Sequence, residues 1–195
     1  MTEHASTERQ HGRPVSATQH RVVLSLGSNI GDRLANLQVG VDILGAAGLE
    51  RPAVSSVYET APVGGPPQDD YLNAVLLAVT ALPAREVLGL AVGAESAAGR
   101  VRTVRFGPRT LDVDVISYGD ETRSDSQLTL PHRRAHERAF VLAPWLELDG
   151  TAVLLGRGRV AELLATIGTA GVRRRSDLRL TVPLGASATA VAPCT

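Results

Sequence analysis

The chain contains no lysine, so all 20 of its basic residues are arginines. This excludes a P-loop lysine, a Schiff-base lysine and a lysine general base. Any phosphate chemistry must therefore use arginine, backbone groups or metal ions. The single cysteine, Cys194, lies one residue from the end of the chain. It allows neither an internal disulfide nor a thiolate metal cluster, and we expect a reducing compartment, the cytoplasm.

Aromatic residues and long apolar runs are also scarce. The chain has three tyrosines, two phenylalanines and one tryptophan, and its formal net charge is zero. An RNA-binding sheet needs exposed aromatics and a basic surface, so we expect no nucleic-acid partner. The apolar run 74–79 is far too short to span a membrane, and the first twenty residues lack the apolar core of a secretory signal. We therefore expect no membrane partner.

The length and composition predict one folded domain. The chain has 195 residues, of which 44% are hydrophobic, which is enough for a substantial core. Residues 1–20 are polar and predict a disordered N-terminal arm. Residues 21–175 carry the periodic patterns of the folded domain. Residues 176–195 turn to Ala, Thr, Ser and Pro and predict a flexible C-terminal tail.

The apolar periodicity changes along the domain in a recognisable order. It predicts strands at 21–26, 53–60, 71–80 and 109–118, and helices at 32–47 and from Pro83 onward. Asn29 is a candidate N-cap for the first helix. The order β-α-β-β-α-β predicts an α+β fold, a ferredoxin-like sandwich with an antiparallel sheet and both helices on one face. A C-terminal extension with a helical segment at 159–168 follows.

Two aspartates interrupt an apolar strand in "RTLDVDVI". Asp112 and Asp114 alternate with Leu111, Val113 and Val115, so their side chains share one face. A solvated strand face would explain one aspartate, but two adjacent like charges repel each other. A divalent cation removes that cost, and carboxylate oxygens favour magnesium over zinc. The pair predicts a magnesium site.

An arginine-rich loop precedes that strand. It contains Arg100, Arg102, Arg105 and Arg109, with no acidic residue between them. A basic surface loop is one interpretation. The other is that the arginines hold magnesium-bound polyphosphate and neutralise its developing charge. Glu95 lies just before the loop on the helix face toward the sheet. It either pairs with one of these arginines or binds a ligand, and the sequence favours neither.

Three weaker patterns also carry chemistry. "GSNIGD" (27–32) lacks the Lys-Ser or Lys-Thr of a phosphate loop, so we interpret it as a tight turn. His132 and His136 have zinc-ligand spacing but no third soft ligand. Tyr71, Phe140 and Asn73 lie where loops meet strands. Two aromatic rings and an amide that donates and accepts suit a flat heterocycle, although most such residues belong to a core.

Five segments together resemble one family. They are "LSLGSNIGDRLANL", "SSVYETAPVGGPPQDDYLNAV", "AAGRVR", "RFGPRTLDVDVI" and "LTLPHRRAHERAFVL". The family is the 6-hydroxymethyl-7,8-dihydropterin pyrophosphokinases of folate biosynthesis, and the resemblance runs from about residue 22 to residue 148. It implies a ferredoxin-like fold and transfer of the ATP diphosphate to the pterin hydroxymethyl group, which leaves AMP.

The resemblance also implies roles for individual residues. Two magnesium ions are held by Asp112 and Asp114, and Arg100 and Arg109 contact phosphates and stabilise charge during transfer. Six residues line the nucleotide site: Glu95, Arg102, Ile116, Thr129, His132 and Arg138. Six bind the pterin: Thr60, Pro62 and Val63 through backbone groups, Asn73 by pairing with its edge, and Tyr71 and Phe140 by stacking. The partners are ATP and the pterin, and we expect a monomer.

Two other kinds of protein fit parts of the pattern. A magnesium-dependent phosphotransferase or phosphohydrolase could use the same carboxylates, but it would not need Tyr71, Asn73 and Phe140 together. A non-catalytic ferredoxin-like binding module would leave the aspartate pair and the loop arginines without a task.

Overall fold

The computed structural model describes residues 18–62, 66–100 and 107–183. The first half of the chain forms β1 (His20–Ser28), α1 (Arg33–Ala46), β2 (Glu50–Val54), β3 (Val57–Thr60), β4 (Tyr71–Thr80), α2 (Ala84–Ala97) and β5 (Asp112–Tyr118). The second half adds β6 (Arg123–Ser124), β7 (Thr129–Leu130), the 3-10 helix η1 (Ala135–Glu137), α3 (Ala139–Leu148), β8 (Val153–Leu154), β9 (Gly158–Arg159), α4 (Val160–Ile167) and β10 (Val172–Arg175).

The main sheet is antiparallel in every strand pair. Its order is β10-β3-β4-β1-β5, and β2 pairs with another part of β4. The predicted strand 53–60 is therefore two strands, because the chain leaves regular pairing at Ser55 and Ser56. There the Ser55 hydroxyl accepts a hydrogen bond from Val75 N at 3.0 Å, so a side chain replaces part of the backbone ladder.

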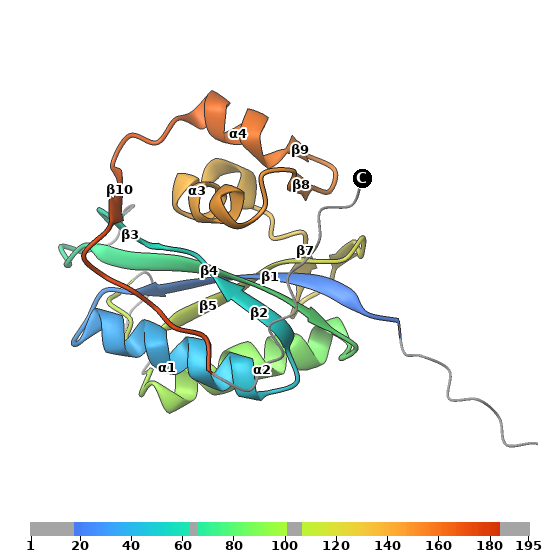
Figure 1. Ribbon diagram of the computed structural model, residues 1–195, viewed down its shortest axis with the longest axis horizontal. Helices are drawn as coiled ribbons and strands as arrows, with labels where there is room; N and C mark the ends of the chain where they lie inside the picture. The colour runs from blue at the N-terminus through green and yellow to red at the C-terminus, as the bar shows by residue number, and fades with distance from the viewer. Residues whose placement is uncertain (1–17, 63–65, 101–106, 184–195) are drawn as a thin grey trace, which may run out of the picture.

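Helices cover both faces of the sheet (Figure 1). The helices α1 and α2 lie side by side on one face, and α3 and α4 lie on the other. The predicted helices at 32–47 and after Pro83 correspond to α1 and α2, and the helical segment 159–168 corresponds to α4. The mixed α/β architecture with an antiparallel sheet is thus confirmed.

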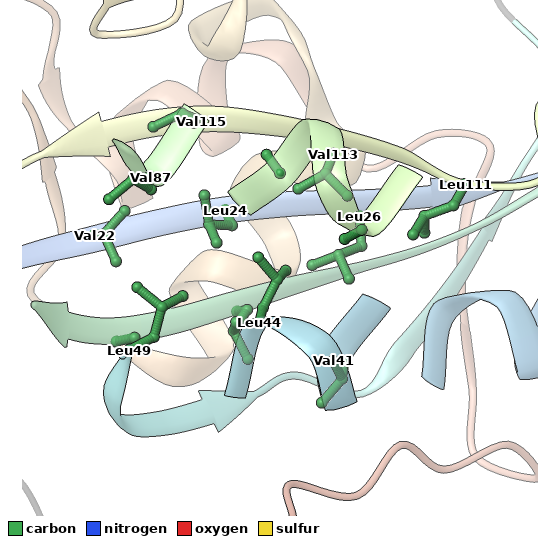
Figure 2. Packing of buried hydrophobic residues seen from close by; sticks show 14 of the residues in the cluster. Val22, Leu24, Leu26, Val41, Leu44, Leu49, Val87, Leu111, Val113 and Val115 are labelled. Atoms are coloured by element: carbon green, nitrogen blue, oxygen red, sulfur yellow. The ribbon is translucent and has the colours of Figure 1, made fainter. Parts of the chain in front are cut away.

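Successive side chains of each sheet strand point to opposite faces, so the sheet has a separate hydrophobic core on each face. Val22, Leu24 and Leu26 of β1 are fully buried against α1 and α2, together with Val113 and Val115 of β5 (Figure 2). A second cluster on the opposite face includes Val75, Ile116, Leu142 and Trp145 and packs α3 against the sheet. Full burial of each such side chain stabilises the fold by roughly 1.5–3 kcal/mol.

The helix α1 is capped by Asp32 rather than by Asn29. The Asp32 carboxylate accepts a hydrogen bond from Ala35 N at 3.0 Å. The prediction of Asn29 as the cap was therefore wrong, because the helix starts at Arg33 and Asn29 lies too far upstream to reach its first amides.

Part of the segment assigned to a flexible tail packs on α1. Gln38 donates to the Thr181 carbonyl at 2.7 Å and accepts from Thr181 N at 3.0 Å. Leu178 and Leu180 pack against the first core. The apolar pattern of these residues is too short to be seen in the sequence, and the remaining residues of the predicted tail, 184–195, lie outside the described part of the chain. Residues 1–17 of the predicted arm also lie outside it.

None of the helices in the described ranges is long and apolar enough to cross a membrane.

Candidate active site

A pocket of about 520 Å³ opens on the sheet face opposite α1 and α2. Its floor is formed by Ser25 and Gly27 of β1, Asn73 of β4, and Asp112 and Asp114 of β5. The strand register explains this grouping, because Gly27 is paired with both Asn73 and Asp112, and Ser25 is paired with Asp114. Alternate residues of three neighbouring strands therefore point to the same side.

The aspartate pair lies at one end of this pocket. Asp112 and Asp114 line it, whereas Val113 and Val115 between and after them are buried in the core on the other face of β5. The prediction that the two carboxylates share a face is confirmed. Their side chains keep 22% and 36% of their exposure, so both remain accessible to a ligand.

Asp112 is held by two arginines from the segment before β5. Arg100 Nη1 lies 2.6 Å from Asp112 Oδ1, and the guanidinium of Arg109 bonds the other oxygen, Oδ2. Burial of Arg109 disfavours its charge, but attraction to Asp112 outweighs this and holds the pKa of Arg109 above its ordinary value. The carboxylate thus keeps Arg109 in the pocket wall and Arg100 behind it.

Glu95 connects this cluster to the core. It is 5% exposed, forms an ion pair with Arg100, and accepts a hydrogen bond from Val113 N at 3.0 Å. Of the two interpretations that the sequence left open, the structure shows the arginine pair. Because a buried carboxylate needs partners, Arg100 and the β5 backbone together account for its position.

Asp114 lies close to two basic side chains from the segment after β7. Arg138 Nη1 lies 2.9 Å from Asp114 Oδ2, and His132 Nε2 lies 3.8 Å from the same oxygen. Burial of His132 lowers its pKa and outweighs the opposing attraction of Asp114, so the imidazole is neutral at neutral pH. His136 lies on the 3-10 helix η1 and His132 lies before it, so the two histidines do not share the face of one α-helix. No cluster of three metal-binding side chains occurs among the described residues, so the zinc interpretation has no support there.

Asn73 lies on the other side of Gly27 from Asp112, at the uncharged end of the pocket floor. Asn73 is 3% exposed, and its amide donates to Thr60 Oγ1 at 2.9 Å. Tyr71 and Phe140 also line the pocket. Burial raises the pKa of Tyr71, which lies close enough to Arg109 and Asp112 to sense their charges. The guanidinium of Arg138 lies 5.7 Å from the centre of the Phe140 ring, so Arg138 joins the two ends of the pocket.

Gly27 leaves room between these groups. A Cβ atom at this position would lie 3.3 Å from Asn73 Oδ1 and 3.6 Å from Tyr71 Cδ1. The missing side chain therefore keeps the floor flat beside the amide, as close approach of a planar ligand requires.

Most predicted site residues line the pocket, but several do not. Ile116 is fully buried against α3, and its carbonyl accepts from His132 N at 2.8 Å. Thr129 lies half-buried in β7, and Arg100 and Glu95 lie behind Asp112 rather than in the pocket wall. Val63 and Arg102 are in the segments that the structure does not describe.

Sequence reasoning missed two parts of the site. Asn29 is 1% exposed and bonds the backbone of Arg109 at both its N–H and its carbonyl. The sequence analysis had interpreted Asn29 as a helix cap within the tight turn "GSNIGD", so its long-range bonds to Arg109 were not predicted. Residues 167–172, between α4 and β10, form a wall of the pocket, and no local pattern indicated their long-range pairing.

The fold and the pocket define a class of enzyme. Paired carboxylates and arginines suit a magnesium-bound polyphosphate, and an amide with two aromatic rings in the same pocket suits a flat polar acceptor. This is the arrangement of a phosphotransferase.

Comparisons with known proteins identify the family. The family described as 7,8-dihydro-6-hydroxymethylpterin-pyrophosphokinase (HPPK) matches residues 23–150. The chain belongs to this family. It is a pyrophosphokinase that acts on the pterin in folate biosynthesis, and enzymes of this family use ATP and generally need Mg²⁺.

Individual relatives agree with this assignment. A 2-amino-4-hydroxy-6-hydroxymethyldihydropteridine pyrophosphokinase of Mycobacterium bovis is 47% identical over 177 residues, which cover 84% of this chain and 90% of the relative. One from Methylorubrum extorquens is 43% identical over 155 residues, covering 79% and 98%. A crystal structure of Plasmodium falciparum HPPK-DHPS has a TM-score of 0.63 at 12% identity, covering 83% of this chain and 50% of that one, and shows the shared fold.

Proposed function

We propose that the two ends of the pocket bind the two substrates of a diphosphate transfer. ATP binds at the end with Asp112 and Asp114, and 6-hydroxymethyl-7,8-dihydropterin binds at the end with Asn73. The pterin hydroxymethyl oxygen attacks the β-phosphorus of ATP, the bond from that phosphorus to the bridging α,β-oxygen breaks, the hydroxyl proton is lost, and AMP leaves. The observation that carries this proposal is the presence of both kinds of group in one pocket.

The aspartate pair fits magnesium. Asp112 and Asp114 offer partly exposed carboxylate oxygens on one strand face, and magnesium is commonly held by one or two carboxylates together with substrate phosphates. No third side-chain ligand lies beside them in the described part of the chain, so substrate phosphates and water would have to supply the remaining ligands. We propose two ions, which neutralise phosphate charge when bound.

The arginines are already close to the places where phosphate charge would lie. Arg109 and Arg138 line the pocket, and each is held by one carboxylate of the pair. If the carboxylates held Mg²⁺, these guanidinium groups would be free to bind phosphate oxygens and stabilise charge during transfer. Arg100 acts with them from behind Asp112.

The remaining residues orient the substrates. Tyr71 and Phe140 stack on the pterin, Asn73 pairs with its edge, and Thr60, Pro62 and Val63 offer backbone groups. Neutral His132 donates a hydrogen bond at the nucleotide end, where we also place Glu95, Arg102, Ile116, Thr129 and Arg138. The less charged pterin end excludes water, which favours the pterin hydroxyl as acceptor.

The strand order also supports the finer description of the fold. The order β5-β1-β4-β3, with α1 and α2 on one face, agrees with a ferredoxin-like sandwich, and β8 to β10 with α4 form the C-terminal extension. Because the pocket is built within one chain, a monomer is sufficient for activity.

Product analysis tests the proposed reaction. The protein is incubated with Mg²⁺ and ATP, with and without 6-hydroxymethyl-7,8-dihydropterin, and nucleotides are separated. We expect AMP and pterin diphosphate in equal amounts, and AMP only when the pterin is present. Release of ADP or phosphate from ATP alone would instead indicate a phosphohydrolase.

A further inference from the structure

A wall of the pocket is formed by the chain between α4 and β10, which follows the segment 23–150 matched by the family. Ile167, Gly168, Ala170, Gly171 and Val172 all line the pocket. Ile167 keeps 40% of its exposure at the mouth of the pocket, where an apolar side chain gains from being covered by a ligand.

The register of β10 assigns this wall to one end of the pocket. Val172 is paired with Thr60 of β3, and Thr60 is paired with Tyr71 of β4. In the same sheet β10 and β5 lie at opposite ends of the strand order, so Val172 is four strands away from the aspartate pair. The segment therefore borders the end that we assign to the pterin.

The turn into β10 has a defined shape. Gly168 and Gly171 have φ angles of 73° and 75°, a region that residues with a side chain rarely adopt. Gly168 N donates to the Leu164 carbonyl at 2.8 Å, and Val172 N donates to the Thr169 carbonyl at 3.0 Å. These bonds end α4 and direct the chain across the pocket to the sheet edge.

A buried carboxylate holds β10 in place. Glu59 of β3 is 8% exposed and forms ion pairs with Arg33, Arg173 and Arg175. Two of these arginines belong to β10, so Glu59 ties the edge strand to its neighbour from the face opposite Thr60. Losing these pairs is costly, because the buried Glu59 carboxylate would be left without its partners. We name Glu59, Arg173 and Arg175 the β10 clamp.

We infer that residues 167–172, positioned by the β10 clamp, are a specificity-determining wall for the pterin. The apolar side chains of Ile167 and Val172 cover the bound heterocycle, and Glu59 is a positioning residue that acts through β10. This inference rests on the assignment of the pterin end under the proposed function. It adds a substrate-binding element from the C-terminal extension that leaves the nucleotide end unchanged.

The first experiment removes the apolar wall. The variant Ile167→Ala/Val172→Ala is compared with Val153→Ala, which truncates a 57% exposed valine on β8 outside the pocket. Calorimetry with a non-hydrolysable ATP analogue and Mg²⁺ measures pterin affinity. We expect about tenfold weaker pterin binding in the double variant, unchanged nucleotide binding, and no change in the control. Unchanged pterin binding would overturn the inference.

The second experiment releases the clamp. Glu59→Gln keeps the size of the side chain but removes its charge, and Arg179→Gln is the control, because Arg179 is an exposed arginine beyond β10. We expect a higher KM for the pterin, little change in kcat or in the KM for ATP, and faster hydrogen exchange at the β10 amides of Glu59→Gln. Faster exchange with an unchanged pterin KM would show a merely structural role and would overturn the inference.

Asn73→Ala distinguishes this inference from the assignment of the pterin end. If Asn73→Ala weakens pterin binding and the wall variants do not, the assignment of the pterin to the Asn73 end is supported and the role of residues 167–172 in binding it is refuted. If none of these variants changes pterin binding, both the position of the pterin and the role of the wall are refuted.

Discussion

Asn29 holds the backbone of Arg109 at two points across 80 residues of sequence. Its Oδ1 accepts from Arg109 N at 2.8 Å, and its own N–H donates to the Arg109 carbonyl at 3.1 Å. The Asn29 amide also donates to Gln68 Oε1 at 2.8 Å. The backbone and side chain of one buried residue thus fix the Gly-Pro-Arg segment (107–109), from which Arg109 reaches Asp112, and the side chain connects this segment to the loop before β4.

Replacing Asn29 by alanine should disturb both stability and catalysis. The substitution leaves a buried N–H of Arg109 without its acceptor, which costs about 1–3 kcal/mol. It also frees the backbone of the segment around Arg109, so we expect kcat to fall more than the affinity for ATP. Denaturant unfolding and steady-state kinetics measure the two effects. Asn36→Ala is the control, because Asn36 bonds the Ile30 carbonyl in the same loop without touching Arg109. Equal effects of the two substitutions would refute a special role for Asn29.

The two aspartates should differ in their effect on stability. Asp112→Ala removes a partner of Arg100, whose side chain is only 8% exposed, whereas Asp114→Ala removes a partner of Arg138, which is 23% exposed. We therefore expect Asp112→Ala to lower the melting temperature of the ligand-free protein more than Asp114→Ala. Both should lower kcat by at least about a hundredfold, as loss of a preorganised charge does. Greater destabilisation by Asp114→Ala would contradict the account.

Gly27→Ala tests the shape of the pocket floor. The new methyl group would press on Asn73 Oδ1 and narrow the space beside Tyr71. We expect weaker pterin binding with little change in nucleotide binding. Stability should hold within about 1 kcal/mol, because alanine in a strand costs less backbone entropy than glycine. Calorimetry and thermal unfolding of the same preparation measure both. Undiminished pterin affinity would show that the heterocycle does not lie over Gly27.

The β10 clamp should make stability depend on pH in the acidic range. Burial of Glu59 disfavours its charge, but hydrogen bonds from Arg175 and Arg173 outweigh this and lower its pKa below the ordinary 4.5. The unfolded chain therefore takes up this proton before the folded chain does. The stabilising contribution of Glu59 is fully present above pH 4.5 and is lost as the pH falls through the folded-state pKa.

Unfolding of the wild type and of Glu59→Gln across this range measures that contribution. The groups that face Glu59 are the guanidinium groups of Arg33, Arg173 and Arg175. Because Glu59 is the carboxylate that gains a proton, the difference in stability should shrink as the pH falls below 4.5. A difference that stayed constant with pH would show that Glu59 does not titrate as described.

Local periodicity was sufficient to predict much of the fold. The stripe of Leu37, Val41 and Leu44 on α1 and the alternation of Asp112 and Asp114 on β5 are visible within a few residues, and both are present in the structure. The break between β2 and β3 at Ser55 could not be predicted from the sequence. The Ser55 hydroxyl accepts the hydrogen bond from Val75 N only because the fold places Val75 opposite it.

The candidate site was predictable where its residues carry chemistry in short motifs. The aspartate pair and Arg109 belong to "GPRTLDVD", and Asn73 lies two residues from Tyr71. The pairing of Asp112 with Arg100 and Arg109 was not predicted. The Arg109 pair is only three residues apart but was overlooked, whereas the Arg100 pair depends on how the loop before β5 folds back. The wall at 167–172 depends on β10 pairing with β3 more than a hundred residues earlier, which no local pattern encodes.

Crossed calorimetry on two pocket variants tests most directly whether the pocket has a polyphosphate end and a pterin end. Binding of a non-hydrolysable ATP analogue with Mg²⁺, and of the pterin in its presence, is measured for Asp114→Asn and for Asn73→Ala. The account predicts that Asp114→Asn weakens magnesium-dependent nucleotide binding, and that Asn73→Ala leaves nucleotide binding intact while weakening pterin binding about tenfold or more. Nucleotide binding lost in Asn73→Ala, or magnesium-dependent nucleotide binding unchanged in Asp114→Asn, would contradict it.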